Sequence, residues 1–280
     1  MEEMHAVRPR RVVITGATGG LGKAFAAECA ERGWDLFLTD LRGDALHMLA
    51  RGLRNAHGVA VDCAPCDLAD ADDRLRLIET LRSRPERIFM LINVAGTDSE
   101  GTFFDQPRRS LLAILRLNIE AAVDLTRSLL VLRDPLSAFH VINVASLAAF
   151  YPMPNKATYA ASKRFLLDFS LALGEEVREL GATVTALCPG GMYTNAECVR
   201  AIRAQGLAGR LTAQSTGSVA AETIDCALAG VPLYIPGTFN RILRRLGGWA
   251  PAPWVAKFIH RRWSSVRAKR RAAEWAEQPV

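Results

Sequence analysis

Three side chains near the middle of the chain have the types and spacing needed to move a proton to or from an alcohol or carbonyl oxygen. The segment NVASLAAFYPMPNKATYAASK, residues 143–163, contains Ser146, Tyr159 and Lys163. A helix would place Tyr159 and Lys163, four residues apart, on one face. A neighbouring ammonium lowers the pKa of a phenol from about 10, which suits the phenol to acid–base work. Ser146 could hold the same oxygen, although an exposed helix face also explains the bare Tyr–Lys spacing.

A glycine-rich segment near the N-terminus has the composition of a phosphate-binding turn. TGATGGLG, residues 15–22, holds four glycines between an apolar run and a helical pattern. Gly16 would allow a sharp turn, Gly20 a close approach to a pyrophosphate, and Gly22 close packing of the next helix on the sheet. The N–H groups that begin this helix would face the phosphates. The spacing is G-x-x-x-G-x-G, and a purely structural turn would need the same small residues.

A carboxylate at the end of the next apolar run supports the nucleotide interpretation. Asp40 follows Gly20 by 20 residues, where a carboxylate can bind both hydroxyls of an adenine ribose. It would repel a 2′-phosphate and so favours NAD over NADP. Arg42 lies close by and could accept that phosphate, so NADP is not excluded. The alternative for Asp40 is a solvated turn residue.

The elements that must position these residues alternate along the chain. Apolar runs predict strands at 11–15, 35–39, 58–62, 88–93, 139–144, 183–188 and 232–235. Helical patterns lie between them near 21–32, 44–55, 70–82, 107–133 and 157–180. The strands are apolar throughout, which is typical of strands buried on both faces of a parallel sheet. The alternation predicts a doubly wound α/β sheet of about seven strands with helices on both faces.

Composition narrows the class of protein. The 280 residues are 50% hydrophobic and carry a formal charge of +6, which favours anionic ligands or surfaces without naming one. Six Cys are too few for a disulfide scaffold, so we expect a reducing, cytoplasmic location. MEEMHAVRPRR does not read as a signal peptide, and no run of about 18 apolar residues predicts a spanning helix.

Together these motifs resemble the short-chain dehydrogenase/reductase family of the compact type, and within it the hydroxysteroid dehydrogenases. The likeness covers about residues 10–195 and includes CDLAD, NVAG, LRLNIEAAVDLT and CPGGMYT. NVAG departs from the family's NNAG at Val94. The resemblance implies a Rossmann-like fold and assigns cofactor contacts to Gly16, Thr18, Gly19, Gly20, Leu21, Gly22, Asp40, Arg42, Asp67, Leu68, Asn93, Ala95, Gly96, Asn118, Tyr159, Lys163, Pro189, Gly190 and Thr194.

The resemblance also implies a mechanism. Tyr159 would exchange the proton while hydride passes to or from the nicotinamide, and Ser146 would steady the substrate oxygen. Lys163 would tune Tyr159 and bind the nicotinamide ribose, and Asn118 would connect Lys163 to solvent through water. Asp67 would contact the adenine, and Thr194 the carboxamide. No metal is expected, because the five His are not paired at ligand spacing.

The substrate is inferred from the loops that would surround it. Phe103, Phe104, Phe150, Tyr151, Met153 and Met192 would form an apolar lining. This favours a lipophilic secondary alcohol or ketone such as a hydroxysteroid. The alternatives are a 3-oxoacyl or other carbonyl reductase that uses NADPH, and a nucleotide-binding sensor without catalysis.

The sequence also predicts how the chain is organised and which partners it has. Residues 1–9 form a tail, 10–195 the dinucleotide-binding and catalytic part, and 196–280 a substrate-loop and helical C-terminal extension of the same domain. The family's two long helices, here 107–133 and 157–180, predict a homodimer or homotetramer. The C-terminal end combines an apolar helical stripe with dense Arg, which favours packing on the domain or on a second subunit over membrane contact. We expect no nucleic acid partner.

Two further features have ordinary explanations. CAPC, residues 63–66, has the spacing of redox and zinc sites, but no second Cys pair accompanies it, so we expect a coincidence. Trp249, Trp254 and Trp263 could be stacking platforms, but their helical spacing favours packing in the core or in a lid.

Overall fold

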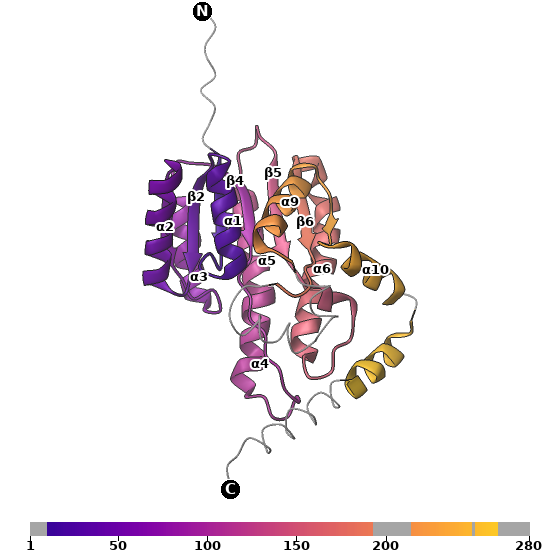
Figure 1. Ribbon diagram of the computed structural model, residues 1–280. Helices are drawn as coiled ribbons and strands as arrows, with labels where there is room; N and C mark the ends of the chain where they lie inside the picture. Colours follow the sequence, from indigo (N-terminus) through magenta and orange to yellow (C-terminus); the bar gives the residue numbers. More distant parts are fainter. Residues whose placement is uncertain (1–9, 193–213, 248–249, 263–280) are drawn as a thin grey trace, which may run out of the picture.

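The computed structural model describes residues 10–192, 214–247 and 250–262, and at the centre of this part of the chain lies a seven-stranded parallel sheet (Figure 1). The strand order is β3-β2-β1-β4-β5-β6-β7. The strands are β1 (Arg11–Thr15), β2 (Asp35–Asp40), β3 (Val61–Pro65), β4 (Ile88–Asn93), β5 (Phe139–Val144), β6 (Ala182–Leu187) and β7 (Leu233–Tyr234). All carboxyl ends therefore meet at one edge, and the order reverses between β1 and β4.

Helices cover both faces of this sheet. They are α1 (Gly20–Glu31), α2 (Gly43–His57), α3 (Ala71–Arg82), α4 (Arg108–Leu115), α5 (Ala121–Val131), α6 (Ala157–Glu176), α9 (Thr216–Leu228) and α10 (Thr238–Gly247). Residues 252–262 form a further helix. The helices α1, α2 and α9 pack on one face with Val12 and Ile14, whereas α3 and α5 pack on the other with Val13. The predicted doubly wound fold is confirmed.

Burial on both faces explains why the strands are apolar throughout. Every residue of β1 and of β5 is buried, and successive side chains of a strand enter opposite layers. Within the described residues, no helix is long and apolar enough to cross a membrane.

The structure differs from the predicted elements in three places. Strand β3 begins at Val61, three residues late, because α2 extends to His57 and Gly58 caps it at φ 69°. The single helix predicted over 107–133 is interrupted by a π-helical turn at Arg116–Glu120. The helix α9 lies within the helical extension predicted over 196–280, but no helix was predicted at its own bounds, and it packs against α1.

Candidate active site

Tyr159 and Lys163 lie on the first two turns of α6, close to the carboxyl end of β5. Lys163 Nζ donates a hydrogen bond of 2.8 Å to the carbonyl oxygen of Val144, the last residue of that strand. The same ammonium lies 5.9 Å from the centroid of the Tyr159 ring. This hydrogen bond helps to hold α6 against the strand end from which Ser146 follows two residues later.

The ammonium of Lys163 is fully enclosed. Burial lowers its pKa to about 8, and the neighbouring Cys188 and Asp98 oppose this shift only in part. At neutral pH the side chain therefore still carries its proton in most molecules. A charged group beside Tyr159 favours the phenolate, as the sequence argument required.

Ser146 begins the short 3₁₀ turn Leu147–Phe150 and caps it. Its Oγ accepts a 3.1 Å hydrogen bond from the N–H of Ala148. A hydroxyl has one proton to donate, and accepting this bond leaves that proton available for a substrate oxygen. The carbonyl oxygen of Pro189 accepts from the N–H of Leu147, so the 3₁₀ turn and the segment after β6 are held together.

Asn118 lies in the π-helical turn and is 1% exposed. Its Oδ1 accepts from the N–H of Thr97 at 2.8 Å, and its Nδ2 donates to the Thr97 carbonyl oxygen at 3.0 Å and to Ser162 Oγ at 3.0 Å. The side chain thus binds the backbone that follows NVAG. Asn118 and Lys163 both pack closely against Gly96. A Cβ added at Gly96 would lie 3.2 Å from both Asn118 Oδ1 and Lys163 Nζ.

The glycine-rich turn fits a bound pyrophosphate. Gly16 has φ +62°, and a Cβ there would lie 2.8 Å from Ala95 Cα. A Cβ at Gly22 would lie 2.1 Å from the Gly16 carbonyl oxygen, so Gly22 packs on the turn itself and not on the sheet as we expected. Gly19 is the N-cap of α1, and no side chain caps this helix. The first turn, with Gly20 and Leu21, therefore has N–H groups suited to phosphate oxygens.

Asp40 lies buried at the carboxyl end of β2. Its Oδ2 accepts from the N–H of Thr18 at 2.9 Å and its Oδ1 from the N–H of Arg42 at 3.1 Å. Burial tends to raise the pKa of this carboxyl, but the hydrogen bonds from Arg42 and Thr18 outweigh it and hold the pKa below its usual value. The Arg42 side chain is 62% exposed, with Nε 3.5 Å from Asp40 Oδ1. A negative charge is therefore fixed at the position where an adenine ribose would bind.

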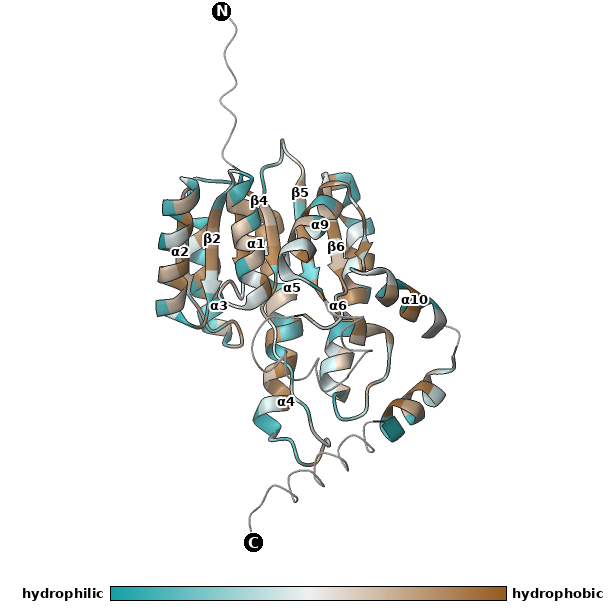
Figure 2. Cartoon of the chain, in the orientation of Figure 1, coloured by the Kyte–Doolittle hydropathy of each residue, from teal (hydrophilic) through white to brown (hydrophobic). Residues whose placement is uncertain are grey.

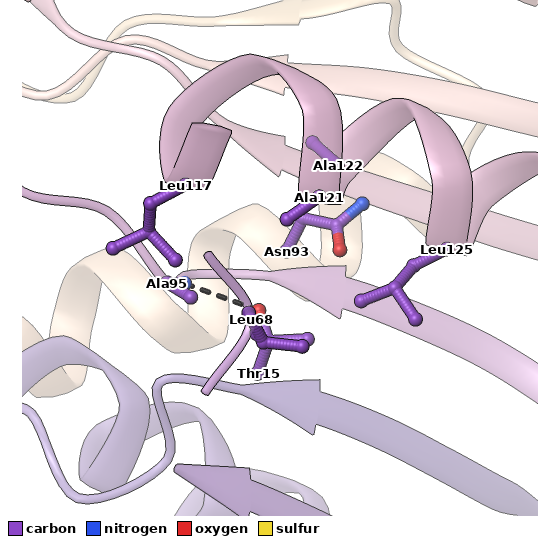
Figure 3. A pocket seen from close by; sticks show the side chains of 8 residues that line it. All are labelled: Thr15, Leu68, Asn93, Ala95, Leu117, Ala121, Ala122 and Leu125. Atoms are coloured by element: carbon purple, nitrogen blue, oxygen red, sulfur yellow. Dashed lines mark hydrogen bonds between the residues drawn. The ribbon is translucent and has the colours of Figure 1, made fainter. Parts of the chain in front are cut away.

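Thr15, which was not predicted as a site residue, joins the loop after β1 to the loop after β4. Thr15 Oγ1 accepts from the N–H groups of Val94 at 3.0 Å and Ala95 at 3.1 Å. Figure 3 shows Thr15, Asn93 and Ala95 around a small cavity of about 10 Å³, closed by Leu68, Leu117, Ala121, Ala122 and Leu125. Thr15 thereby holds the NVAG backbone against the Gly16 turn.

The Asn93 side chain belongs to a buried network. Its Nδ2 donates to Thr126 Oγ1 at 3.1 Å and to Asn143 Oδ1 at 2.8 Å. Asn143 Nδ2 in turn donates to Ser170 Oγ at 2.9 Å. The Asn93 amide thus joins β4 and β5 to α5 and α6, and the predicted cofactor contact at Asn93 is one for its backbone.

The segment after β3 is held by an arginine that the sequence argument did not consider. Asp67 is exposed and accepts from the N–H of Ala69, whereas Leu68 is buried. Arg74, 3% exposed, donates to the Leu68 carbonyl oxygen at 2.9 Å and to Asp124 at 2.9 Å, and it also pairs with Glu120. Since Glu120 ends the π-helical turn, Arg74 connects the Asp67–Leu68 segment to the turn that carries Asn118.

The last predicted contacts follow β6. Pro189 is buried and Gly190 is half-buried, whereas Thr194 lies outside the described residues. The preceding Cys188 receives a hydrogen bond from the Ser146 backbone, but burial is the larger effect and raises the pKa of the thiol to about 12. Cys188 therefore remains a neutral thiol beside the site.

The CAPC segment shows no metal-binding arrangement. Cys63 Sγ lies 3.3 Å from His47 Nδ1, and burial raises the pKa of the Cys66 thiol to about 12. In the described ranges, no three His, Cys, Asp or Glu side chains are grouped so that they could hold a metal ion.

Two curated proteins resemble the chain along much of its length. A 1-deoxy-11-beta-hydroxypentalenate dehydrogenase from Streptomyces exfoliatus is 31% identical over 79% of this chain and 78% of its own length. A very-long-chain 3-oxoacyl-CoA reductase from Laccaria bicolor is 32% identical over 62% of this chain, but the match spans only 52% of that protein.

Solved structures and a family model agree with these relatives. A short-chain dehydrogenase from Sphingobium yanoikuyae in complex with NADPH has a TM-score of 0.72 at 24% identity, with 97% of both chains covered. A 7beta-hydroxysteroid dehydrogenase has a TM-score of 0.81 at 20% identity, with 90% of this chain and 96% of that chain covered. The family model for short chain dehydrogenases matches residues 10–203. The chain therefore belongs to the short-chain dehydrogenase family and is an NAD(P)-dependent oxidoreductase.

Proposed function

We propose that this enzyme transfers hydride between NAD and a lipophilic secondary alcohol or ketone, such as a hydroxysteroid, with Tyr159 as general acid and base. The observation that carries the proposal is the hydrogen bond from Lys163 Nζ to the Val144 carbonyl oxygen. It keeps a buried ammonium 5.9 Å from the Tyr159 ring centroid and beside the strand end that leads to Ser146. These are the requirements for moving a proton at a carbinol oxygen.

Each residue has a distinct part in this reaction. The nicotinamide ring of the bound dinucleotide supplies the hydride chemistry. Tyr159 takes the proton of the alcohol during oxidation and returns one to the carbonyl oxygen during reduction. Ser146 donates its hydroxyl proton to the same oxygen and orients it, while the Lys163 charge favours the phenolate. Asn118 holds the backbone at Thr97 and so keeps Gly96 against Lys163.

The preference for NAD rests on Asp40. Its charge is fixed by two backbone N–H groups at the end of β2, where it would accept ribose hydroxyls and repel a 2′-phosphate. The exposed Arg42 side chain lies beside this carboxylate, and its backbone N–H helps to hold the charge in place. Asp40 would repel the 2′-phosphate of NADP, whereas Arg42 would attract it. The comparison of turnover with NAD and with NADP therefore tests which of the two side chains decides the preference.

The substrate class rests on the loop after Ser146. Phe150, Tyr151 and Met153 line an apolar cavity of about 530 Å³ that Ala252 and Ala256 close from the C-terminal helix. Phe103 and Phe104 are exposed, with their rings 6.0 Å apart, on the segment that follows β4. Met192 packs against the core. An apolar surface of this size suits a steroid or acyl chain better than a small polar alcohol.

The test is the absorbance of reduced nicotinamide during turnover, with NAD and NADP in parallel. The panel contains hydroxysteroids, 3-hydroxyacyl compounds and short secondary alcohols. We expect turnover with NAD and a lipophilic substrate, and its loss in Tyr159→Phe. The matched control is Tyr234→Phe, which removes an exposed hydroxyl that bonds Glu222 and should retain turnover. If only 3-oxoacyl compounds are turned over, and only with NADPH, the enzyme is a carbonyl reductase and the proposal is wrong. Dinucleotide binding without turnover of any substrate would favour a sensor.

A further inference from the structure

The excess of positive over negative charge in this chain comes from one C-terminal segment. The 48 residues between Asp225 and Glu274 contain ten Arg and Lys and no Asp or Glu. The rest of the chain holds 25 Arg and Lys against 29 Asp and Glu, a formal net charge of −4. The formal charge of +6 therefore comes from this segment and not from the rest of the chain.

The first described helix in this segment is α10, which is fastened to the body on one side only. The Tyr151 hydroxyl donates a 2.7 Å hydrogen bond to the Leu243 carbonyl oxygen, and the Arg244 guanidinium lies 5.2 Å from the Phe150 ring centroid. Away from these contacts, Phe239 and Ile242 are 36% and 48% exposed. Apolar side chains thus face outward on a helix that also presents exposed cations.

The second helix, residues 252–262, also exposes apolar side chains beside cations, and to a larger fraction than α10 does. Trp254 and Phe258 are four residues apart, on one helix face, and are 74% and 65% exposed. The exposed cations Lys257 and Arg261 lie within one turn of them, while Val255 is half-buried. Figure 1 shows this helix at the periphery beyond α10, and Figure 2 shows apolar and polar residues side by side on both helices.

We propose that these two helices form a surface that docks on an anionic lipid bilayer. The C-terminal surface is defined by the exposed side chains Phe239, Arg241, Ile242, Arg245, Trp254, Lys257, Phe258 and Arg261. Large apolar side chains enter the boundary between headgroups and acyl chains, and flanking cations bind the anionic headgroups. The acid-free composition supplies the charge complementarity that such a membrane requires.

The composition of the C-terminal surface disfavours two other partners, a second copy of the chain and a nucleic acid. A second copy that pairs through this surface about a two-fold axis would bring equal positive charges together without acids of the segment to neutralise them. A nucleic acid would satisfy the cations but would leave Phe239 and Ile242 without apolar partners. The bilayer is the partner that uses both kinds of side chain.

The experiment is flotation of the full chain with vesicles of phosphatidylcholine, alone or mixed with phosphatidylglycerol, at low and high salt. We expect binding to the mixed vesicles, weaker binding at high salt, and little binding to phosphatidylcholine alone. The double variants Trp254→Gln/Phe258→Gln and Arg241→Glu/Arg245→Glu should each weaken binding by at least about tenfold. This readout needs no turnover, so it is independent of the proposed function.

Matched controls lie at the opposite edge of the sheet. Leu136→Gln removes an 83% exposed apolar side chain before β5, and Arg82→Glu/Arg87→Glu reverses two exposed cations between α3 and β4. Both controls should bind vesicles like the parent, and thermal unfolding tests whether each variant is folded.

Several results would overturn the proposal. These are no binding to anionic vesicles, or binding that neither C-terminal double variant weakens. A lower mass of Trp254→Gln/Phe258→Gln in sedimentation velocity would identify a copy–copy interface instead. Binding of duplex DNA in the absence of vesicle binding would identify a nucleic acid surface.

Discussion

At the scale of single residues, the site depends on a charge that the protein encloses at a cost. Lys163 is buried, and its ammonium has the Val144 carbonyl oxygen as a hydrogen-bond partner at 2.8 Å. One such partner replaces only part of the hydration that burial removes, which is why the pKa falls to about 8. The charged form of Lys163 therefore destabilises the fold. The proposed mechanism needs this charge beside Tyr159, and strongly shifted pKa values are typical of functional sites.

This cost predicts how stability depends on pH. The folded pKa of Lys163 is depressed, so between about pH 8 and pH 10.5 the unfolded chain binds more protons, and stability gains from Lys163 as pH rises. Against Lys163→Met, the wild type should therefore gain up to roughly 3 kcal/mol across this window. Urea unfolding of both proteins without cofactor measures the difference. A difference that stays constant from pH 7.5 to pH 10 would show that the pKa of Lys163 is not depressed in the fold, so that the side chain keeps its proton there as it does in the unfolded chain.

The spacing of these residues could be predicted from sequence, but their partners could not. Ser146, Tyr159 and Lys163 lie within 18 residues of one another, and helix periodicity relates the last two. The hydrogen bonds of Thr15 cross 79 and 80 residues of sequence, and those of Asn93 cross 33 and 50. No local pattern marks a Thr or Asn as the partner of a particular distant backbone group.

At the scale of elements, a buried arginine connects the segment after β3 to the π-helical turn that carries Asn118. Arg74 on α3 reaches the Leu68 carbonyl oxygen, and it also contacts Glu120 of the π-helical turn and Asp124 of α5. The π-helical turn carries Asn118, whose side chain binds Thr97. The positions of two loops that lie apart in sequence thus depend on one guanidinium.

Replacement of this arginine should destabilise the fold. Arg74→Met leaves the Leu68 carbonyl oxygen without its donor, while Glu120 and Asp124, which are 52% and 39% exposed, can be hydrated by solvent. We expect a loss of about 1–3 kcal/mol in urea unfolding. The control is Arg178→Met, which removes an exposed pair with Glu175 and should change stability by less than about 0.5 kcal/mol. Equal effects of both variants would contradict the proposed connection.

The elements were predictable where hydrophobic pattern and burial agree. The strands β1, β2, β4 and β5 were predicted within one residue, because strands buried on both faces form continuous apolar runs. Strand β3 was displaced because Gly58 belongs to the end of α2 and not to the start of the strand. The bounds of helix α9 were not predicted, because small residues such as Ala220 and Ala227 form part of its buried face. Small residues make the helical repeat of apolar side chains hard to recognise in the sequence.

At the scale of the whole molecule, the C-terminal surface and the exposed aromatic side chains of α6 differ in their electrostatics. The C-terminal surface is acid-free and strongly positive. On α6, by contrast, Phe165 is 42% exposed and stacks on Phe169 at 5.9 Å, close to the exposed ion pair of Arg164 with Asp168. A surface with both signs of charge around an aromatic pair suits contact with the same surface of a second copy.

We therefore expect α6, and not the C-terminal surface, to hold the proposed homodimer or homotetramer together. Phe165→Asp should lower the mass in sedimentation velocity, because a two-fold contact would place two new carboxylates against each other's apolar partners. Leu75→Asp, which changes a 54% exposed side chain on α3, should leave the mass unaltered. The variant Trp254→Gln/Phe258→Gln should also keep the parent mass while losing vesicle binding. An oligomer that survives Phe165→Asp would move the subunit contact away from this face of α6, whereas a monomeric parent protein would exclude the homo-oligomer itself.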